Sequence, residues 1–194
     1  MKCDIILSGV GGQGILSIAA VIGEAIRTEG LQIKQAEVHG MSQRGGDVQT
    51  NLRISSEAID SDLIALGGAD AIISLEPMEA LRYAPYLKES GWVVTSSKPF
   101  INIPNYPSEE LLAEELKKMP KLLTLDVEQI AKDAEVSRSA NIVLLGAAST
   151  ILSIEQKDLE AGIERIFSRK GRAIVDMNIK ALRVGAEAVK EQLK

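Results

Sequence analysis

Three glycines near the start of the chain have the spacing of a nucleotide-binding loop. Gly9, Gly11 and Gly14 form the pattern G-x-G-x-x-G, with Gly12 and Gln13 between the last two. Glycine lets the backbone approach a ligand closely, and the unpaired amides at the start of a helix attract phosphate. The pattern therefore indicates a nucleotide or phosphate site. The alternative interpretation is that these glycines serve only the tight packing of a helix on a strand.

A second group of candidate binding residues lies at positions 37–46. Glu37 follows Gly14 at about the 20-residue distance at which dinucleotide folds place an acid that binds ribose. It could instead brace the neighbouring loop. His39 could transfer a proton or hydrogen-bond across an interface, because histidine titrates near neutral pH. Arg44 could bind an anion or form an interface ion pair. The other candidates in this segment are Met41, Ser42, Gly45 and Gly46.

The elements predicted around these two segments bring them together. A strand at residues 3–8, a helix at 15–28 and a strand at 31–38 form a βαβ unit in which a glycine-rich loop follows each strand. The carboxyl ends of parallel strands lie at one edge of a sheet, so both loops should face one crevice. The second strand is polar enough to lie near the edge of the sheet.

The rest of the chain continues to alternate strands and helices, as α/β proteins do. We expect a single domain, residues 1–194, with a Rossmann-like three-layer fold, a mostly parallel sheet and a helical C-terminal segment. Further strands are predicted at residues 48–54, 71–75, 92–95 and 122–125. Helices are predicted at residues 77–87, 109–119, 127–134, 141–154, 156–167 and 172–194.

Two features of these elements have more than one interpretation. The last helix carries an apolar stripe that could pack on its own sheet or meet a partner subunit. Glu76, which precedes Pro77, could face the crevice, cap the following helix or pair across an interface. The stripe consists of Val175, Ile179, Leu182, Ala186, Val189 and Leu193.

Composition excludes several classes of site. The chain has 194 residues, 45% of them hydrophobic and 25% charged, which is typical of a globular protein. A net charge of -5 gives no general attraction to nucleic acid or anionic lipid, and 3% aromatic residues are too few for a base-stacking platform. One cysteine, Cys3, cannot hold an iron–sulfur cluster, and one histidine cannot build a multi-histidine metal site. We therefore expect no metal site.

The location of the protein follows from its apolar segments. The most apolar stretch, residues 140–154, is too short to span a bilayer. Asp4 interrupts any signal-peptide core at the N-terminus. We expect a cytoplasmic protein that binds neither membrane nor nucleic acid. Cys3 begins a buried strand and is expected to be unreactive.

Residues 9–14 and 37–46 together resemble the gamma-type subunit of 2-oxoacid:ferredoxin oxidoreductases. The chain is most similar to the beta subunit of the indolepyruvate ferredoxin oxidoreductases, on its size and on residues 74–83. Residues 141–146 and the positions of Asn178, Ala181 and Gly185 also fit. The resemblance covers most of the chain, and its first two motifs are the most specific.

The resemblance implies a division of labour between subunits. Members of the family decarboxylate a 2-oxoacid on thiamine diphosphate, pass electrons through iron–sulfur clusters to ferredoxin and transfer the acyl group to coenzyme A. This chain lacks the Gly-Asp-Gly motif with paired Asn that a thiamine diphosphate and Mg site would need. We therefore expect that this chain is inactive on its own and has no catalytic residue. Its larger partner would carry the cofactors and pass electrons to ferredoxin.

The contribution of this chain to such a complex has several possible forms. The helix start at residues 11–14 could bind the pyrophosphate of coenzyme A, with Arg44 on a phosphate. Alternatively, residues 39–46 could close over the partner's active site. Two rival functions are a free-standing oxidoreductase that holds NAD on Glu37, and a scaffold subunit with an empty glycine loop. The subunit interpretation predicts an exposed apolar patch, and it leaves the choice of 2-oxoacid to the thiamine-binding chain.

Overall fold

The computed structural model describes residues 1–27, 30–40 and 45–193. They contain a six-stranded sheet in the order β2-β3-β1-β4-β5-β6. Strand β3 runs antiparallel to both of its neighbours, and the pairs β1–β4, β4–β5 and β5–β6 are parallel. The strands are β1 (Lys2–Val10), β2 (Gln32–His39), β3 (Asp47–Ser55), β4 (Ala69–Ser74), β5 (Leu87–Ser96) and β6 (Lys121–Leu125).

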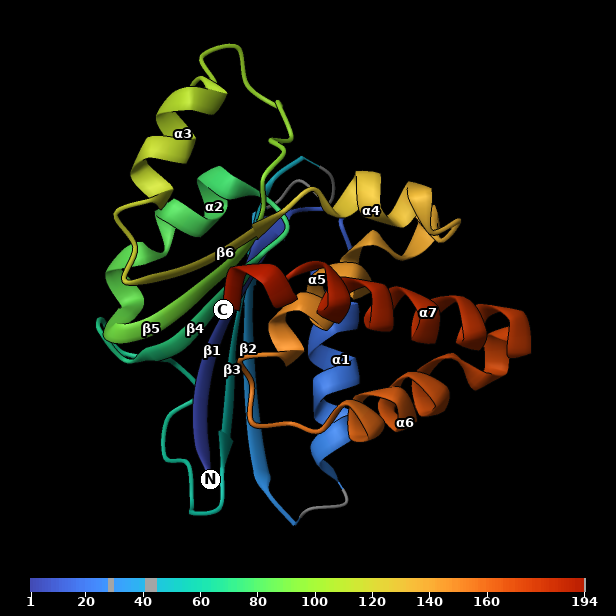
Figure 1. Cartoon of the computed structure of the whole chain (residues 1–194). Helices are drawn as coiled ribbons and strands as arrows, with labels where there is room; N and C mark the ends of the chain where they lie inside the picture. The colour runs from blue at the N-terminus through green and yellow to red at the C-terminus, as the bar shows by residue number, and fades with distance from the viewer. Residues whose placement is uncertain (28–29, 41–44, 194) are drawn as a thin grey trace.

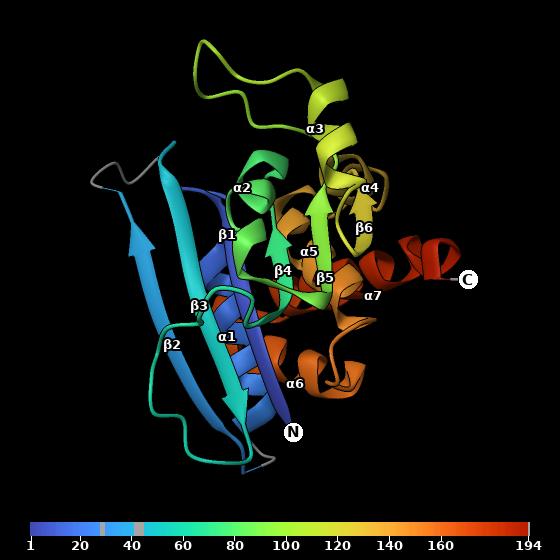
Figure 2. The same cartoon turned by 90° about the vertical axis from the view of Figure 1, so that its left-hand side faces the viewer.

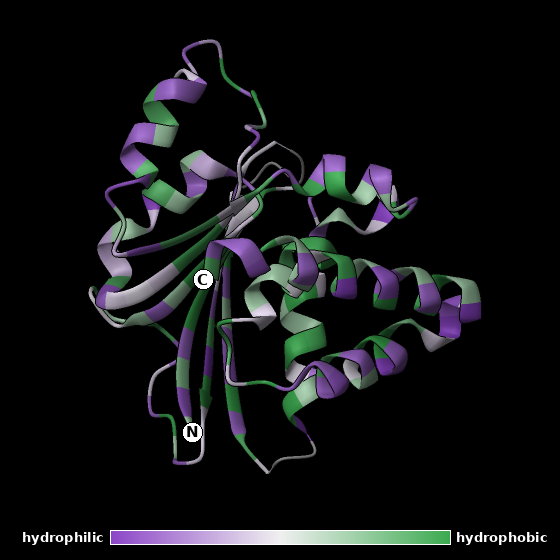
Figure 3. Ribbon diagram, in the orientation of Figure 1, coloured by the Kyte–Doolittle hydropathy of each residue, from purple (hydrophilic) through white to green (hydrophobic). Residues whose placement is uncertain are grey.

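Helices cover both faces of this sheet (Figures 1 and 2). One face packs on α1 and α5 in a large apolar core, and the other packs on α2 and α3 in a smaller one. The C-terminal helices α6 and α7 lie outside α1 and α5, and their alternating hydrophilic and hydrophobic bands match that half-exposed position (Figure 3). The helices are α1 (Ile15–Ile26), α2 (Pro77–Arg82), α3 (Glu109–Leu116), α4 (Val127–Asp133), α5 (Ala140–Ser149), α6 (Gln156–Phe167) and α7 (Arg172–Ala188).

The predicted α/β class, mostly parallel sheet and helical C-terminal segment are confirmed, and β2 does lie at the sheet edge. One part of the predicted topology is wrong. The βαβ unit placed β2 beside β1, but β3 lies between them and pairs with both. At a strand spacing of about 4.8 Å, the ends of β1 and β2 are therefore about 10 Å apart.

Several predicted boundaries also differ from the structure. The helix expected to reach residue 87 ends at Arg82 and is followed by a 3-10 turn, Ala84–Tyr86, so that β5 already begins at Leu87. Pro85 stands inside that turn, where its fixed φ angle suits a turn but not a continued helix. The buried helix predicted at 141–154 ends at Ser149.

Helix α7 buries a narrower face than its apolar stripe predicts. Ile179 and Ala186 are only partly buried and Leu193 is exposed, whereas Asn178 and Gly185 are buried. The helix packs on α5, not on the sheet. The approach is close, because a Cβ added to Gly185 would lie 1.9 Å from the carbonyl oxygen of Val143. Small residues, more than the apolar stripe, therefore define this contact.

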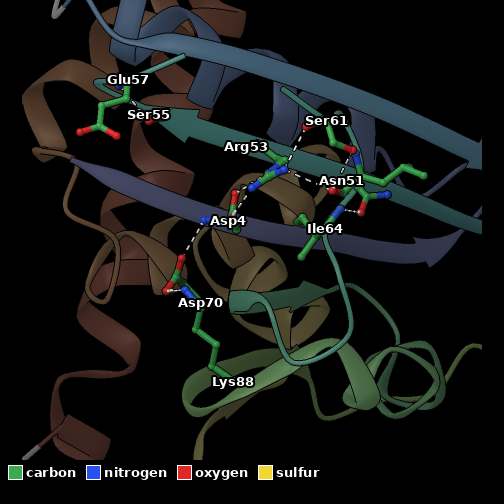
Figure 4. A network of polar contacts seen from close by, with 10 residues as sticks. Asp4, Asn51, Arg53, Ser55, Glu57, Ser61, Ile64, Asp70 and Lys88 are labelled. Atoms are coloured by element: carbon green, nitrogen blue, oxygen red, sulfur yellow. Dashed lines mark hydrogen bonds and ion pairs between the residues drawn. The ribbon is translucent and has the colours of Figure 1, made fainter. Parts of the chain in front are cut away.

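A polar network fastens the sheet at the end opposite the glycine loop (Figure 4). The buried Asp4 carboxylate accepts a hydrogen bond from Arg53 Nε at 2.8 Å, and Arg53 also donates to the carbonyl of Ser61 at 2.9 Å. The backbone amide of Asp4 donates to Asp70, which forms an ion pair with Lys88. These bonds hold the loop of residues 57–68 against the sheet, so the network has a structural role.

Cys3 lies near this network, and the structure gives a physical cause for its expected low reactivity. Burial raises the pKa of its thiol to about 12, and the negative charges of Asp70 and Asp4 add to this effect. Only the thiolate reacts, so at pH 8 we expect alkylation by iodoacetamide roughly a thousandfold slower than for free cysteine. Mass spectrometry of timed samples measures this rate. A rate within tenfold of free cysteine before unfolding in urea would contradict the expectation.

Candidate functional site

The two glycine-rich loops meet at the carboxyl edge of the sheet. The Gly11 amide donates to the carbonyl of Gly46 at 2.8 Å, and the Gly45 amide donates to the carbonyl of Gly11 at 3.3 Å. The loop that joins β2 to β3 is therefore paired with the loop that joins β1 to α1. The predicted common crevice exists even though β1 and β2 are not neighbours. The paired loops lie across the start of β3, the strand between them.

Gln13 holds the glycine loop in shape from inside. Its side-chain oxygen accepts a hydrogen bond from the Val10 amide at 2.7 Å, and its Nε2 donates to the carbonyl of Leu75 at 3.4 Å. Leu75 follows β4, so the side chain links the loop to the neighbouring strand. The role of Gln13 in this geometry is to support the loop, and its amide group is already engaged.

The glycines of the motif have different roles. A Cβ on Gly9 would lie 2.8 Å from Gln13 Oε1, so this glycine makes room for the support just described. Gly12 and Gly14 adopt φ angles of +102° and +89°, which side-chain-bearing residues rarely adopt. Gly12 has open space where its Cβ would stand, whereas Gly14 faces Asn141, whose Nδ2 donates to the Gly14 carbonyl at 3.1 Å.

The start of α1 offers amide donors to a ligand. Gly14 is its N-cap and supplies no capping side chain. The amides of Ile15 and Leu16 stand in the first turn, where a helix provides them with no acceptor. The Gly11 amide, by contrast, is already bonded to Gly46. An anion at this position would therefore meet the helix start rather than the whole glycine loop.

A cavity of about 440 Å³ opens beside this helix start. Its volume lies within the range of small-molecule sites. Glycine backbone forms one wall, and Glu37 and His39 from the edge strand face it. The lining residues are Val10, Gly11, Gly12, Gly14, Ile15, Leu16, Ser17, Glu37, His39 and Val48. The structure thus brings the first loop, Glu37 and His39 to one cavity.

The remaining predicted site residues lie in or next to the second loop. Gly45 and Gly46 contact Gly11 and lie at the edge of the site. Met41, Ser42 and Arg44 lie outside the described residues. His39 is exposed, and its Nδ1 lies 3.0 Å from the carbonyl of Gly40, a contact that fits Nδ1 as the protonated nitrogen. The anion-binding role of Arg44 stays a prediction.

Asp47, which follows the second loop, contacts polar side chains of the segment after β4 that were not predicted as its partners. The Tyr83 hydroxyl donates to Asp47, the first residue of β3, at 2.9 Å. Buried Glu79 pairs with Arg82 at 2.7 Å. Burial raises the pKa of Glu79, and Asp47 raises it further, while Arg82 opposes the shift. Glu76 caps α2, accepting from the Glu79 amide at 2.8 Å, as one interpretation of the sequence proposed.

Asn102 is a contact that sequence reasoning missed. It lies in the long segment between β5 and α3, and its Nδ2 donates to the carbonyl of Gly45 at 2.8 Å. Asn102 and Gly45 are 57 positions apart, and the motif that contains Gly45 gives no indication of this partner. The segment after β5 therefore forms part of the surroundings of the site.

The described part of the chain offers little to a metal or redox cofactor. It contains no group of three or more His, Cys, Asp or Glu side chains placed to hold a metal ion. The chain's single cysteine, Cys3, is buried enough to have a raised pKa. These residues do not fit an iron–sulfur cluster or the Mg of thiamine diphosphate.

None of the helices in the described ranges is long and apolar enough to cross a membrane.

Comparison with known proteins gives this site its context. Residues 4–188 match the family described as pyruvate ferredoxin/flavodoxin oxidoreductase. The chain is 35% identical over 194 residues to the indolepyruvate oxidoreductase subunit IorB of Archaeoglobus fulgidus, covering 95% of this chain and 94% of that relative. The chain belongs to this family. It is a gamma-type subunit of the 2-oxoacid:ferredoxin oxidoreductases, as its glycine motifs predicted.

Solved structures of the family have the same fold. The gamma subunit of a keto/oxoacid ferredoxin oxidoreductase from Geobacter sulfurreducens is 27% identical, with a TM-score of 0.68 over 95% of this chain and 96% of that chain. A 2-oxoglutarate:ferredoxin oxidoreductase from Magnetococcus marinus is 22% identical, with a TM-score of 0.77. This chain is covered completely in that comparison but spans only 32% of the solved chain. In that enzyme the fold is therefore one part of a longer polypeptide.

Proposed function

We propose that this chain is the smaller subunit of an indolepyruvate-type 2-oxoacid:ferredoxin oxidoreductase. Thiamine diphosphate, Mg and the iron–sulfur clusters belong to a larger partner subunit, which delivers the electrons to ferredoxin. The relative IorB, similar over nearly its whole length, supports the indolepyruvate type. The lack of cofactor ligands in the described part of this chain supports their placement on the partner.

We further propose that the cavity beside α1 binds the phosphate-bearing part of coenzyme A. The observation that carries this proposal is the pairing of the two loops beside the first-turn amides of Ile15 and Leu16, to which the helix offers no acceptor. A pyrophosphate suits those amides and the positive end of the helix dipole. Arg44, three residues before the described position Asp47, would supply a balancing charge. The solved 2-oxoglutarate enzyme with this fold holds coenzyme A, which agrees with such a ligand.

A nicotinamide dinucleotide is the second candidate, because Glu37 lines the same cavity. One feature favours coenzyme A. The inserted strand β3 increases the distance between Glu37 and the glycine loop relative to an adjacent-strand arrangement. The Gly11 amide does not distinguish the two ligands, because it is bonded to Gly46 and so is not offered to the pyrophosphate of either.

Calorimetric titration of the chain, alone and in its complex, with coenzyme A and with NAD tests this assignment. We expect coenzyme A to bind at submillimolar concentration and NAD not to bind. In the complex, Arg44→Ala should raise the KM for coenzyme A about tenfold, the cost of one charge-assisted phosphate contact. No binding at millimolar coenzyme A, together with an unchanged KM in the Arg44→Ala complex, would contradict the coenzyme A site. The scaffold function would then remain.

A further inference from the structure

Residues 97–108, which we call the apical loop, stand out from the carboxyl edge of the sheet between β5 and α3 (Figures 1 and 2). Three of their apolar side chains face solvent. Phe100 is 46% exposed, Ile101 71% and Ile103 39%. A single exposed apolar residue needs no explanation, but three on one projecting loop are typical of a surface that a partner covers.

The apical loop is anchored at its base. Glu76 is fully buried, and its carboxylate accepts hydrogen bonds from the Tyr106 hydroxyl and from the Phe100 amide. Near the start of the loop, Lys98 forms an ion pair with Glu109 at 3.1 Å. The loop therefore displays its apolar side chains from a fixed base. A surface that is ordered before binding loses less entropy when a partner docks.

The apical loop is also joined to the candidate site. Asn102 donates to Gly45, and Gly45 donates to Gly11, so two hydrogen bonds in series connect the loop with the glycine loop. A second cavity, of about 340 Å³, lies beside Phe100 and Ile101. It is also lined by Gln13 and Asn141, which support the glycine loop. A partner on the apical loop would therefore stand directly beside the site.

We propose that the apical loop is the docking element for the larger, thiamine-binding subunit, with Phe100 and Ile101 at the centre of the contact. This inference rests on the proposed function. In the solved 2-oxoglutarate enzyme the same fold is 32% of one chain, so that polypeptide carries further parts that could cover a projecting loop. The apical loop lies next to the candidate site, where cofactors on another chain have to approach. A second copy at this position would turn one site towards another and leave both away from the cofactors.

The test compares two substitutions at equally exposed apolar side chains. Ile101→Asp places a charge in the proposed contact, and Leu66→Asp places one on the loop of residues 57–68, at 70% exposure. Both variants should unfold at the same temperature as the unchanged chain, because neither side chain is buried. We expect Ile101→Asp to weaken binding to the co-expressed larger subunit at least tenfold, since a buried unpaired charge is costly, and Leu66→Asp to change it less than twofold.

The outcomes separate this inference from the proposed function. If the unchanged chain binds no larger subunit, the proposed function fails. If it binds, and Ile101→Asp binds equally well, the docking role is overturned while the subunit function stands. Equal weakening by Leu66→Asp would also overturn it. So would a homodimer that Ile101→Asp dissociates while binding to the larger subunit is unchanged, since the occupant would then be a second copy.

Discussion

Gly185→Ala is expected to destabilise the protein by about 3 kcal/mol or more, because the added methyl group has no space between α5 and α7. Its Cβ would lie 1.9 Å from the carbonyl oxygen of Val143 and 2.7 Å from the carbonyl carbon. Both atoms belong to backbone inside a buried helix, so no side chain can move away. For a chain of this size, such a loss lowers the melting temperature by about 10 °C, which differential scanning calorimetry measures directly.

Gly23→Ala is the matched control for this prediction. Gly23 is also a helix glycine, but its Cβ would meet only Ile33 Cδ1, at an ordinary distance of 3.4 Å. Replacing glycine by alanine within a helix favours the helix by about 0.5–1 kcal/mol, so the control should be neutral or stabilising. If Gly185→Ala melted within 2 °C of the unchanged protein, the close packing of α7 on α5 would be contradicted.

Gly12→Ala is expected to raise the KM for coenzyme A at least tenfold in the assembled enzyme. The methyl group would point into the open space beside the cavity, where the ligand approaches the protein backbone. Contact with phosphate through backbone amides depends on that close approach. The maximal rate should change less than the KM, because the cofactors that carry the reaction are placed on the other subunit. Steady-state kinetics with varied coenzyme A gives both constants.

Gly171→Ala separates this effect from backbone strain. Gly171 has a φ angle of +96°, close to the +102° of Gly12, and no atom lies within 4 Å of the point that its Cβ would occupy. The two substitutions should therefore cost similar stability, about 1–3 kcal/mol. Gly171 precedes α7 and is not among the residues that line the cavity, so its variant should keep the KM unchanged. Equal KM values for coenzyme A in the two variants would contradict the placement of the glycine loop in the binding site.

Local sequence patterns predicted most of the elements of this fold. Asp126 and Ser108 each cap a predicted helix, because their side-chain oxygens accept hydrogen bonds from the amides of Gln129 and Leu111 respectively. These signals are local, because a cap depends on residues three positions away. The position of β3 was not predictable in this way. Its alternating pattern describes a strand with two unlike faces and contains nothing about which neighbours it will pair with.

The candidate site was predictable to a similar extent. The glycine spacing located the loop, and Glu37 and His39 do line its cavity. Asn102 was missed, and Glu76 was weighed as a residue of the crevice but not as the anchor of Phe100 and Tyr106, because these contacts join distant segments. The packing face of α7 differed for a related reason. Apolar periodicity favours large residues, whereas close helix contact depends on small ones such as Gly185.

We expect this chain to work only as one part of a divided enzyme. The experiment is 2-oxoacid-dependent reduction of ferredoxin, measured for the purified chain, for the larger subunit and for the two combined, with thiamine diphosphate and coenzyme A present. Turnover should occur only in the combined sample and should be highest with indolepyruvate. Turnover of any 2-oxoacid, or reduction of NAD, by the purified chain alone would contradict it.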